Sequence, residues 1–172
     1  MRRLLSLSLI GLLATLFLHL TFAQDDSPKP VQQPIAFSHK LHAESGVLCA
    51  RCHTKAETKD QAGIPTAKDC ITCHRGFQKD GQTDSTTLQT LAEYEKAHKE
   101  IAWVRIYKLP GFVFFSHKSH LQAKATCATC HGEVQTREVL WKEKATSMAS
   151  CMNCHQEQKA STGCNYCHEL NR

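Results

Sequence analysis

All ten cysteines of the chain belong to one repeated pattern, Cys-x-x-Cys-His, which occurs five times. Two thiols at this spacing can form thioethers with the two vinyl groups of one porphyrin, and the histidine that follows can then ligate the iron. The sequence therefore predicts five covalently bound haem c groups. The predicted attachment residues are Cys49, Cys52, Cys70, Cys73, Cys127, Cys130, Cys151, Cys154, Cys164 and Cys167. The motif histidines, as iron ligands, are His53, His74, His131, His155 and His168.

Two other kinds of site also use paired cysteines. Structural zinc sites do so, but zinc does not require a histidine directly after each of five pairs. A thioredoxin-like redox motif would occur once, within a βαβ unit. No cysteine is left over for a disulfide or a free thiol. Haem attachment is therefore the interpretation that explains every cysteine.

The remaining histidines match the number of open iron positions. A haem iron takes two axial ligands, and five histidines lie outside both the motifs and the N-terminal apolar segment: His39, His42, His98, His117 and His120. Methionine is another axial ligand, but only Met148 and Met152 follow Met1, and Met152 lies inside a motif, where it is poorly placed to reach its own iron. We expect all five irons to be ligated by two histidines. The alternatives are that some of these histidines are surface residues and that some irons bind methionine or stay open.

This ligation has functional consequences. Methionine raises the haem potential, so haems with two histidines are expected to have comparatively low potentials. An iron with six ligands has no vacant position for a substrate. The ligand count therefore favours electron transfer over catalysis, with no catalytic residues and no small-molecule substrate.

The chain contains an internal duplication. Phe37 to His42 recurs as Phe115 to His120 at an offset of 78 residues, which also relates the first motif to the third. The next motif of the second half is three residues further on, as one short insertion would explain. The two histidines of each repeat are three apart and share one side of a helix. We expect each pair to serve two different haems; chelation of one metal is the alternative.

A helix is predicted between the two halves. Thr86 and Gln89 have the spacing of a capping box, and Leu88, Leu91 and Tyr94 then fall on one broad face together with His98. This placement favours His98 as an inward-pointing axial ligand, with a core histidine as the alternative. The Pro110-Gly111 pair ends this connection.

The predicted fold is mostly helical and irregular, with short helices and loops wrapped around five covalent haems and little β structure. We divide the chain into a signal peptide (1–23), a flexible leader (24–34), a dihaem half (35–83), a connecting helix and loop (84–110) and a trihaem half (111–172). About 30 residues per haem cannot bury a large side-chain core. The haems are therefore expected to form much of the interior.

The N-terminus has the features of an export signal. Arg2 and Arg3 precede a mostly apolar segment, and the small residues Thr21 and Ala23 suit cleavage after Ala23. We expect a periplasmic protein, with an uncleaved membrane anchor as the alternative. Loss of both arginines lowers the formal charge from +5 to +3, and the propionates of five haems add about −10. The basic composition therefore does not indicate a nucleic-acid partner.

The order of these motifs resembles that of the class III cytochromes c, the cytochrome c3 and c7 group. The likeness lies in the Phe37 to His42 segment and in Cys49, which follows ten residues after His39. The resemblance implies that His39 ligates the iron of the His53 haem and that His117 ligates that of the His131 haem. By the same resemblance His42 and His120 reach other haems, which it does not identify.

A second resemblance covers most of the mature chain. Ile64-Pro65, Trp103-Val104-Arg105, Leu109-Pro110, Cys130-His131-Gly132 and Met148 are similar to the pentahaem subunit of alternative complex III, a bacterial quinol-oxidising assembly. That subunit commonly has Gly-Trp before the fourth motif, where this chain has Ala149-Ser150.

We therefore expect a periplasmic cytochrome that passes electrons between respiratory redox proteins. The first alternative is a fixed subunit of a membrane quinol-oxidising complex. The second is a multihaem reductase, which would need one open iron.

Overall fold

The computed structural model describes residues 29–75 and 85–168. The predicted signal peptide and the first five residues of the leader (24–28) lie outside this part of the chain. Its helices are α2 (His39–Glu44), α3 (Cys49–Cys52), α4 (Ala67–His74), α5 (Ser85–Lys96), α6 (His117–Gln122), α7 (Cys127–His131), α8 (Met148–Glu157) and α9 (Cys164–Cys167), with a 3-10 turn η2 (Val134–Thr136). The described residues form no strand beyond an isolated bridge between Val113 and His168. The prediction of a helical and irregular fold with little β structure is confirmed.

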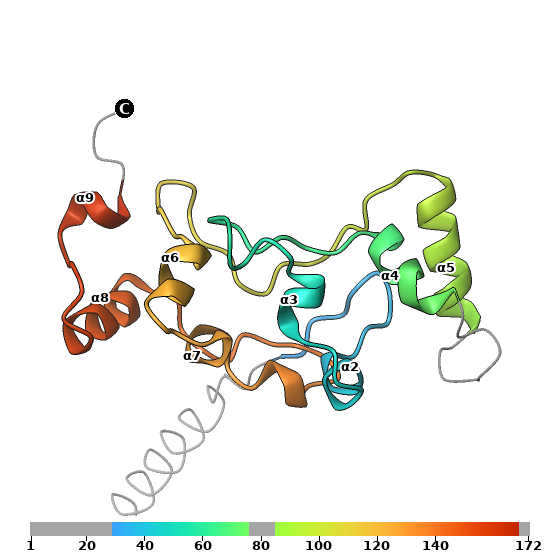
Figure 1. The fold of residues 1–172 in the computed structure, drawn as a ribbon, viewed down its shortest axis with the longest axis horizontal. Coiled ribbons are helices and arrows are strands. Elements are labelled where there is room, and N and C mark those ends of the chain that lie inside the picture. Colours follow the sequence, from blue (N-terminus) through green and yellow to red (C-terminus); the bar gives the residue numbers. More distant parts are fainter. Residues whose placement is uncertain (1–28, 76–84, 169–172) are drawn as a thin grey trace, which may run out of the picture.

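The helices are distributed along the long axis of the molecule rather than gathered into a bundle (Figure 1). Helices α4 and α5 pack against each other at one end, and α8 and α9 lie at the opposite end. Helices α2, α3, α6 and α7 lie between them, and α2 packs against η2. The cysteines of the five haem motifs lie on five different helices: α3, α4, α7, α8 and α9. The order of these helices in space therefore sets the order of the motifs.

Three of the five motif helices, α4, α7 and α8, begin at side chains that cap them. Thr66 and Asp69 form a capping box at α4, and Thr126 and Thr129 form one at α7. Ser147 caps α8 by accepting a hydrogen bond from the amide of Ser150. These contacts satisfy amides that have no partner within the helix. On each helical turn the two motif thiols, three positions apart, then lie on the same side.

The helix predicted between the two halves is α5, but it ends before His98. Its last residue is Lys96, and His98 has a φ of 49° two residues later. The amide of His98 donates to Glu95 and that of Lys99 to Tyr94, both at 3.0 Å. This is the hydrogen-bond pattern of a Schellman motif, which ends a helix in a left-handed residue. The prediction that His98 lies on the apolar face of this helix is therefore wrong.

The side-chain core is small. Its buried members are Ile35, Ala67, Leu91 and Ile101, and Trp103 packs against them while its indole donates to the carbonyl of Pro65 at 3.3 Å. In the described residues no large side chain is fully buried. This agrees with the expectation that side chains alone do not form the interior. Within the same residues no helix is long and apolar enough to cross a membrane.

Candidate haem-binding site

Three motif histidines each face a histidine from outside the motifs. The ring centroids are 5.9 Å apart for His42 and His74, 5.9 Å for His120 and His155, and 6.4 Å for His117 and His131. Metal–imidazole bonds are about 2 Å long and the centroid lies roughly 1 Å beyond the nitrogen, so two histidines on one iron have centroids roughly 6 Å apart. The spacing of all three pairs therefore fits an iron between the rings.

A fourth pair, His39 and His53, is indicated by the electrostatic interaction between the two side chains. Burial, together with smaller contributions from the nearby His53 and His42, lowers the pKa of His39 to about 4. Burial likewise lowers the pKa of His131, with smaller contributions from His117 and His53. These imidazoles are neutral at neutral pH, and the neutral form is the one that can donate a lone pair to a metal. Eight of the ten predicted axial histidines are thus brought together in four pairs.

The orientation of five of these rings is set by backbone carbonyls. Carbonyl oxygens only accept hydrogen bonds, so Nδ1 carries the proton and Nε2 keeps the lone pair that a metal needs. The Nδ1 atoms donate over 2.7–2.8 Å, from His42 to Ser38, His53 to Gly63, His117 to Asp60, His120 to Ser116 and His155 to Ser161. This arrangement is the usual one for histidines that bind metal in proteins, and it fits an axial role on haem iron.

The two predicted repeats have the same local geometry. Phe37 lies edge-on to His39 at 4.8 Å and 87°, and stacks on His42 at 4.5 Å and 27°. The corresponding values for Phe115 are 4.9 Å and 88° to the first histidine of its repeat, and 4.4 Å and 28° to the second. The predicted duplication is confirmed for these segments. Within each repeat the two histidines turn to different motif histidines, which favours two haems over one chelated metal.

The thiols of neighbouring motifs come close together in one continuous order. Starting from the α4 end, the order of the motifs is second, first, third, fourth and fifth, and each motif has a thiol near a thiol of the next. The interacting pairs are Cys70 with Cys52, Cys49 with Cys127, Cys130 with Cys154, and Cys151 with Cys167. Burial raises the pKa of Cys70, Cys127, Cys130 and Cys151, and the neighbouring thiols raise it further. The attachment points therefore form a linear series along the molecule.

A polar network holds the backbone next to the third motif. The hydroxyl of Tyr107 donates to the carbonyl of His131 at 3.1 Å and accepts from the amides of Glu143 at 3.0 Å and Lys144 at 3.2 Å. The Tyr107 ring also lies edge-on to the His131 ring at 4.5 Å. A single side chain thus ties the end of α7 to a loop that is distant in sequence.

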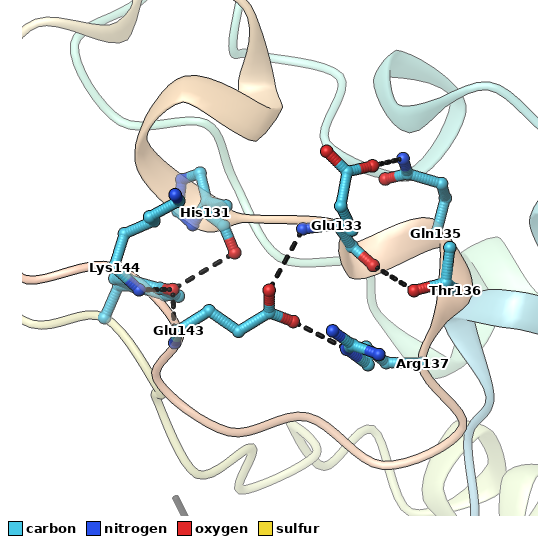
Figure 2. A network of polar contacts seen from close by, with 8 residues as sticks. His131, Glu133, Gln135, Thr136, Arg137, Glu143 and Lys144 are labelled. Atoms are coloured by element: carbon cyan, nitrogen blue, oxygen red, sulfur yellow. Dashed lines mark hydrogen bonds and ion pairs between the residues drawn. The ribbon is translucent and has the colours of Figure 1, made fainter.

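The carboxylate of Glu143 completes this network (Figure 2). It accepts from Arg137 Nε at 2.7 Å and from the amide of Glu133 at 3.2 Å. The hydrogen bond from Arg137 holds the pKa of Glu143 below its usual value. Arg137 also lies 4.4 Å from the centroid of the Trp141 ring, within the range of a cation–π contact. Tyr107, Arg137 and Glu143 could not be identified from the sequence, because none of them belongs to a motif or a periodic pattern.

The last two predicted iron ligands, His98 and His168, are not brought together. His98 is exposed just beyond α5, whereas His168 directly follows α9 at the other end of the molecule (Figure 1). The His168 ring lies 5.8 Å from that of Phe112, and its Nδ1 is buried without a hydrogen-bond partner.

The histidines of the site meet in pairs rather than in larger clusters. Within the described ranges, no group of three or more histidine, cysteine, aspartate or glutamate side chains converges on one point. Structural zinc is usually held by four ligands in a tetrahedron, whereas a haem supplies four nitrogens itself and needs only two axial ligands. The paired arrangement therefore suits haem better than zinc.

Comparison with known proteins identifies the family. The family described as cytochrome c3 matches residues 41–139, more than half of the chain. The chain belongs to the cytochrome c3 family. The family described as cytochrome c7 and related cytochrome c matches residues 113–169. The multihaem cytochrome c subunit of menaquinone reductase from Nitratidesulfovibrio vulgaris (strain Hildenborough) is 28% identical over 165 residues, which cover 80% of this chain and 77% of that protein.

This cytochrome is therefore a multihaem electron-transfer protein with covalently bound haem c. The predicted resemblance to the class III cytochromes c is confirmed. When bound, haem supplies reversible one-electron chemistry, and the protein tunes it through the axial ligands and the groups around them.

Proposed function

We propose that the cytochrome binds five haems, one at each motif, and that four of them have two histidine ligands. The proposed ligand pairs are His39 with His53, His42 with His74, His117 with His131, and His120 with His155. The ring spacings of three pairs, the electrostatic interaction of His39 with His53 and the protonated Nδ1 atoms of five rings support this assignment. Such haems have no vacant position, so they exchange electrons without binding a substrate, and low potentials are expected for them.

The function that follows is a linear electron relay. The single observation that carries it is the continuous order of the motif thiols from α4 through α3, α7 and α8 to α9. Haems attached in this order would lie side by side, so an electron that enters at one end could pass through each in turn. Partner redox proteins would dock at the two ends, where the terminal haems of the series would lie. We propose no enzymatic step within the relay.

The ligand assignment is tested by replacing one distal histidine. His120→Ala should convert the His155 haem, one of five, from low-spin to high-spin iron while all covalent haem is retained. Electron paramagnetic resonance of the oxidised holoprotein measures the spin state, and the pyridine haemochrome assay counts the haem. Lys118→Ala, an exposed residue of the same helix, is the matched control and should change nothing. If the low-spin signal of His120→Ala equals that of the wild type, the pairing with His155 is wrong.

We further propose that the protein acts in the periplasm after export by its N-terminal segment, and that it has no nucleic-acid partner. The dihaem half (35–83), the connecting segment (84–110) and the trihaem half (111–172) would be its successive parts.

A second candidate is a fixed subunit of a membrane quinone-linked complex. The similarity to the menaquinone reductase subunit over 80% of this chain favours it. Its partners would then be the other subunits of that complex. Purification of the tagged cytochrome from detergent-solubilised membranes distinguishes the two: stable co-purification with integral membrane proteins favours the subunit, and recovery from the periplasmic fraction alone favours the carrier.

A further inference from the structure

One haem motif is left without a histidine partner in the described part of the chain. The four pairs above account for His39, His42, His117 and His120, so among the histidines of the described residues His98 alone remains for the iron at His168. This step rests on the proposed function, because it requires five haems and the four ligand pairs assigned there.

His98 is too far away to serve that iron within the same molecule. Helices α5 and α9 lie at opposite ends of the long axis (Figure 1), and His98 follows α5 by two residues. The Schellman motif fixes the backbone of His98 in the left-handed region. His98 is therefore held just beyond the end of α5, where it is exposed.

The surroundings of the last motif are apolar. The Phe112 ring lies beside His168, Val113 forms a bridge with it, and the amide of Phe114 donates to the carbonyl of Cys167 at 2.8 Å. Phe112 and Tyr166 are 62% and 72% exposed. The phenyl ring of Phe112 has no lone pair to donate to an iron, and Tyr166 lies between the two cysteines of its own motif.

We infer that the haem at His168 has no histidine in its distal position and that its iron is the one place in this cytochrome where a small exogenous ligand binds. The ligand class is a neutral π-acceptor with a donor lone pair, such as carbon monoxide, on the ferrous iron, or an anionic or nitrogen donor on the ferric iron. Binding adds one coordinate bond from the ligand's lone pair and changes neither the oxidation state nor the covalent attachment. The haem lies at the α9 end of the relay, where solutes can reach it.

The test uses the full-length holoprotein reduced with dithionite and titrated with carbon monoxide. We expect binding to one haem in five, read from the Soret difference spectrum, and a matching high-spin fraction in the oxidised protein. His98→Ala should leave both values unchanged. The double variant Cys164→Ser/Cys167→Ser should remove one haem and, with it, carbon monoxide binding, whereas the corresponding change at Cys49 and Cys52 should remove a haem and keep the binding.

Three results would overturn the inference. Entirely low-spin iron without carbon monoxide binding would mean that the position is filled. A new high-spin haem in His98→Ala would mean that His98 reaches an iron after all, and one in Met152→Leu would identify a methionine ligand. A failure of the proposed function looks different, because it would give fewer than five haems or a high-spin fraction clearly above one in five.

Discussion

The contact between Tyr107 and the third haem motif allows a quantitative prediction. Replacing Tyr107 with phenylalanine removes the hydroxyl alone and leaves the ring packed against His131. Three hydrogen bonds are lost at once, to the carbonyl of His131 and from the amides of Glu143 and Lys144. All three partners are backbone groups, so no side-chain rotation can give them a new partner.

The expected cost follows from these three bonds. An intramolecular hydrogen bond contributes about 0.5–1.5 kcal/mol net, so the full loss would lie between roughly 1.5 and 4.5 kcal/mol. The site is only partly buried, and water can replace some of the lost contacts, so we expect about 2 kcal/mol. For a chain of this length such a loss lowers the melting temperature by roughly 4–8 °C.

The assay is thermal or guanidinium unfolding of the oxidised holoprotein, followed by the low-spin Soret band. Tyr166→Phe is the matched control, because the Tyr166 side chain is 72% exposed, and it should change stability by less than about 0.5 kcal/mol. Haem content and low-spin character of Tyr107→Phe should equal those of the wild type, since the axial histidines remain. Equal stability of Tyr107→Phe and Tyr166→Phe would refute the conclusion that this network holds the His131 segment in place.

Two further predictions concern backbone conformation. Gly132→Ala should destabilise the holoprotein by about 1–3 kcal/mol, because Gly132 has a φ of 75° and a new Cβ would lie 2.8 Å from the Cβ of Glu143. The unfolding midpoint in guanidinium measures this loss of stability. An unchanged midpoint would contradict the prediction. Lys124→Gly should stabilise the protein by up to about 1 kcal/mol, because Lys124, two residues after the end of α6, has a φ of 67°. The equivalent position of the first repeat is Gly46, with a φ of 79°. A lower melting temperature for Lys124→Gly would show that the lysine side chain stabilises the protein by more than its left-handed backbone destabilises it.

The proposed ligand pairs also explain why the duplicated segments keep both histidines. In each repeat a serine caps the helix with its side chain and fixes the second histidine with its carbonyl, as Ser38 does for His42 and Ser116 for His120. One helical turn can thereby present two imidazoles in set orientations to two neighbouring haems. Two ligands on one turn suit a relay of closely spaced haems, because few residues are available for each haem.

The sequence alone determined the chemistry of this cytochrome. A haem attachment motif is complete within five consecutive residues, so the covalent chemistry can be recognised without any knowledge of the fold. The duplicated segments that begin at Phe37 and Phe115 could likewise be recognised from six consecutive residues. Their helices follow from the serine caps and the histidine spacing. The number of candidate ligands could be counted for the same reason.

The family resemblance already implied two of the four pairs, but only the tertiary structure showed that His42 meets His74 and that His120 meets His155. The partners in each histidine pair are separated by 14 to 35 residues, and nothing in the sequence between them states the distance in space. The helix end at His98 depended on a left-handed residue that is not glycine, which a periodic pattern cannot anticipate. The Tyr107 network joins α7 to a loop through backbone groups that every residue possesses, so its residue types carry no signal. Local covalent chemistry can be inferred from neighbours in sequence, whereas axial pairing depends on long-range packing.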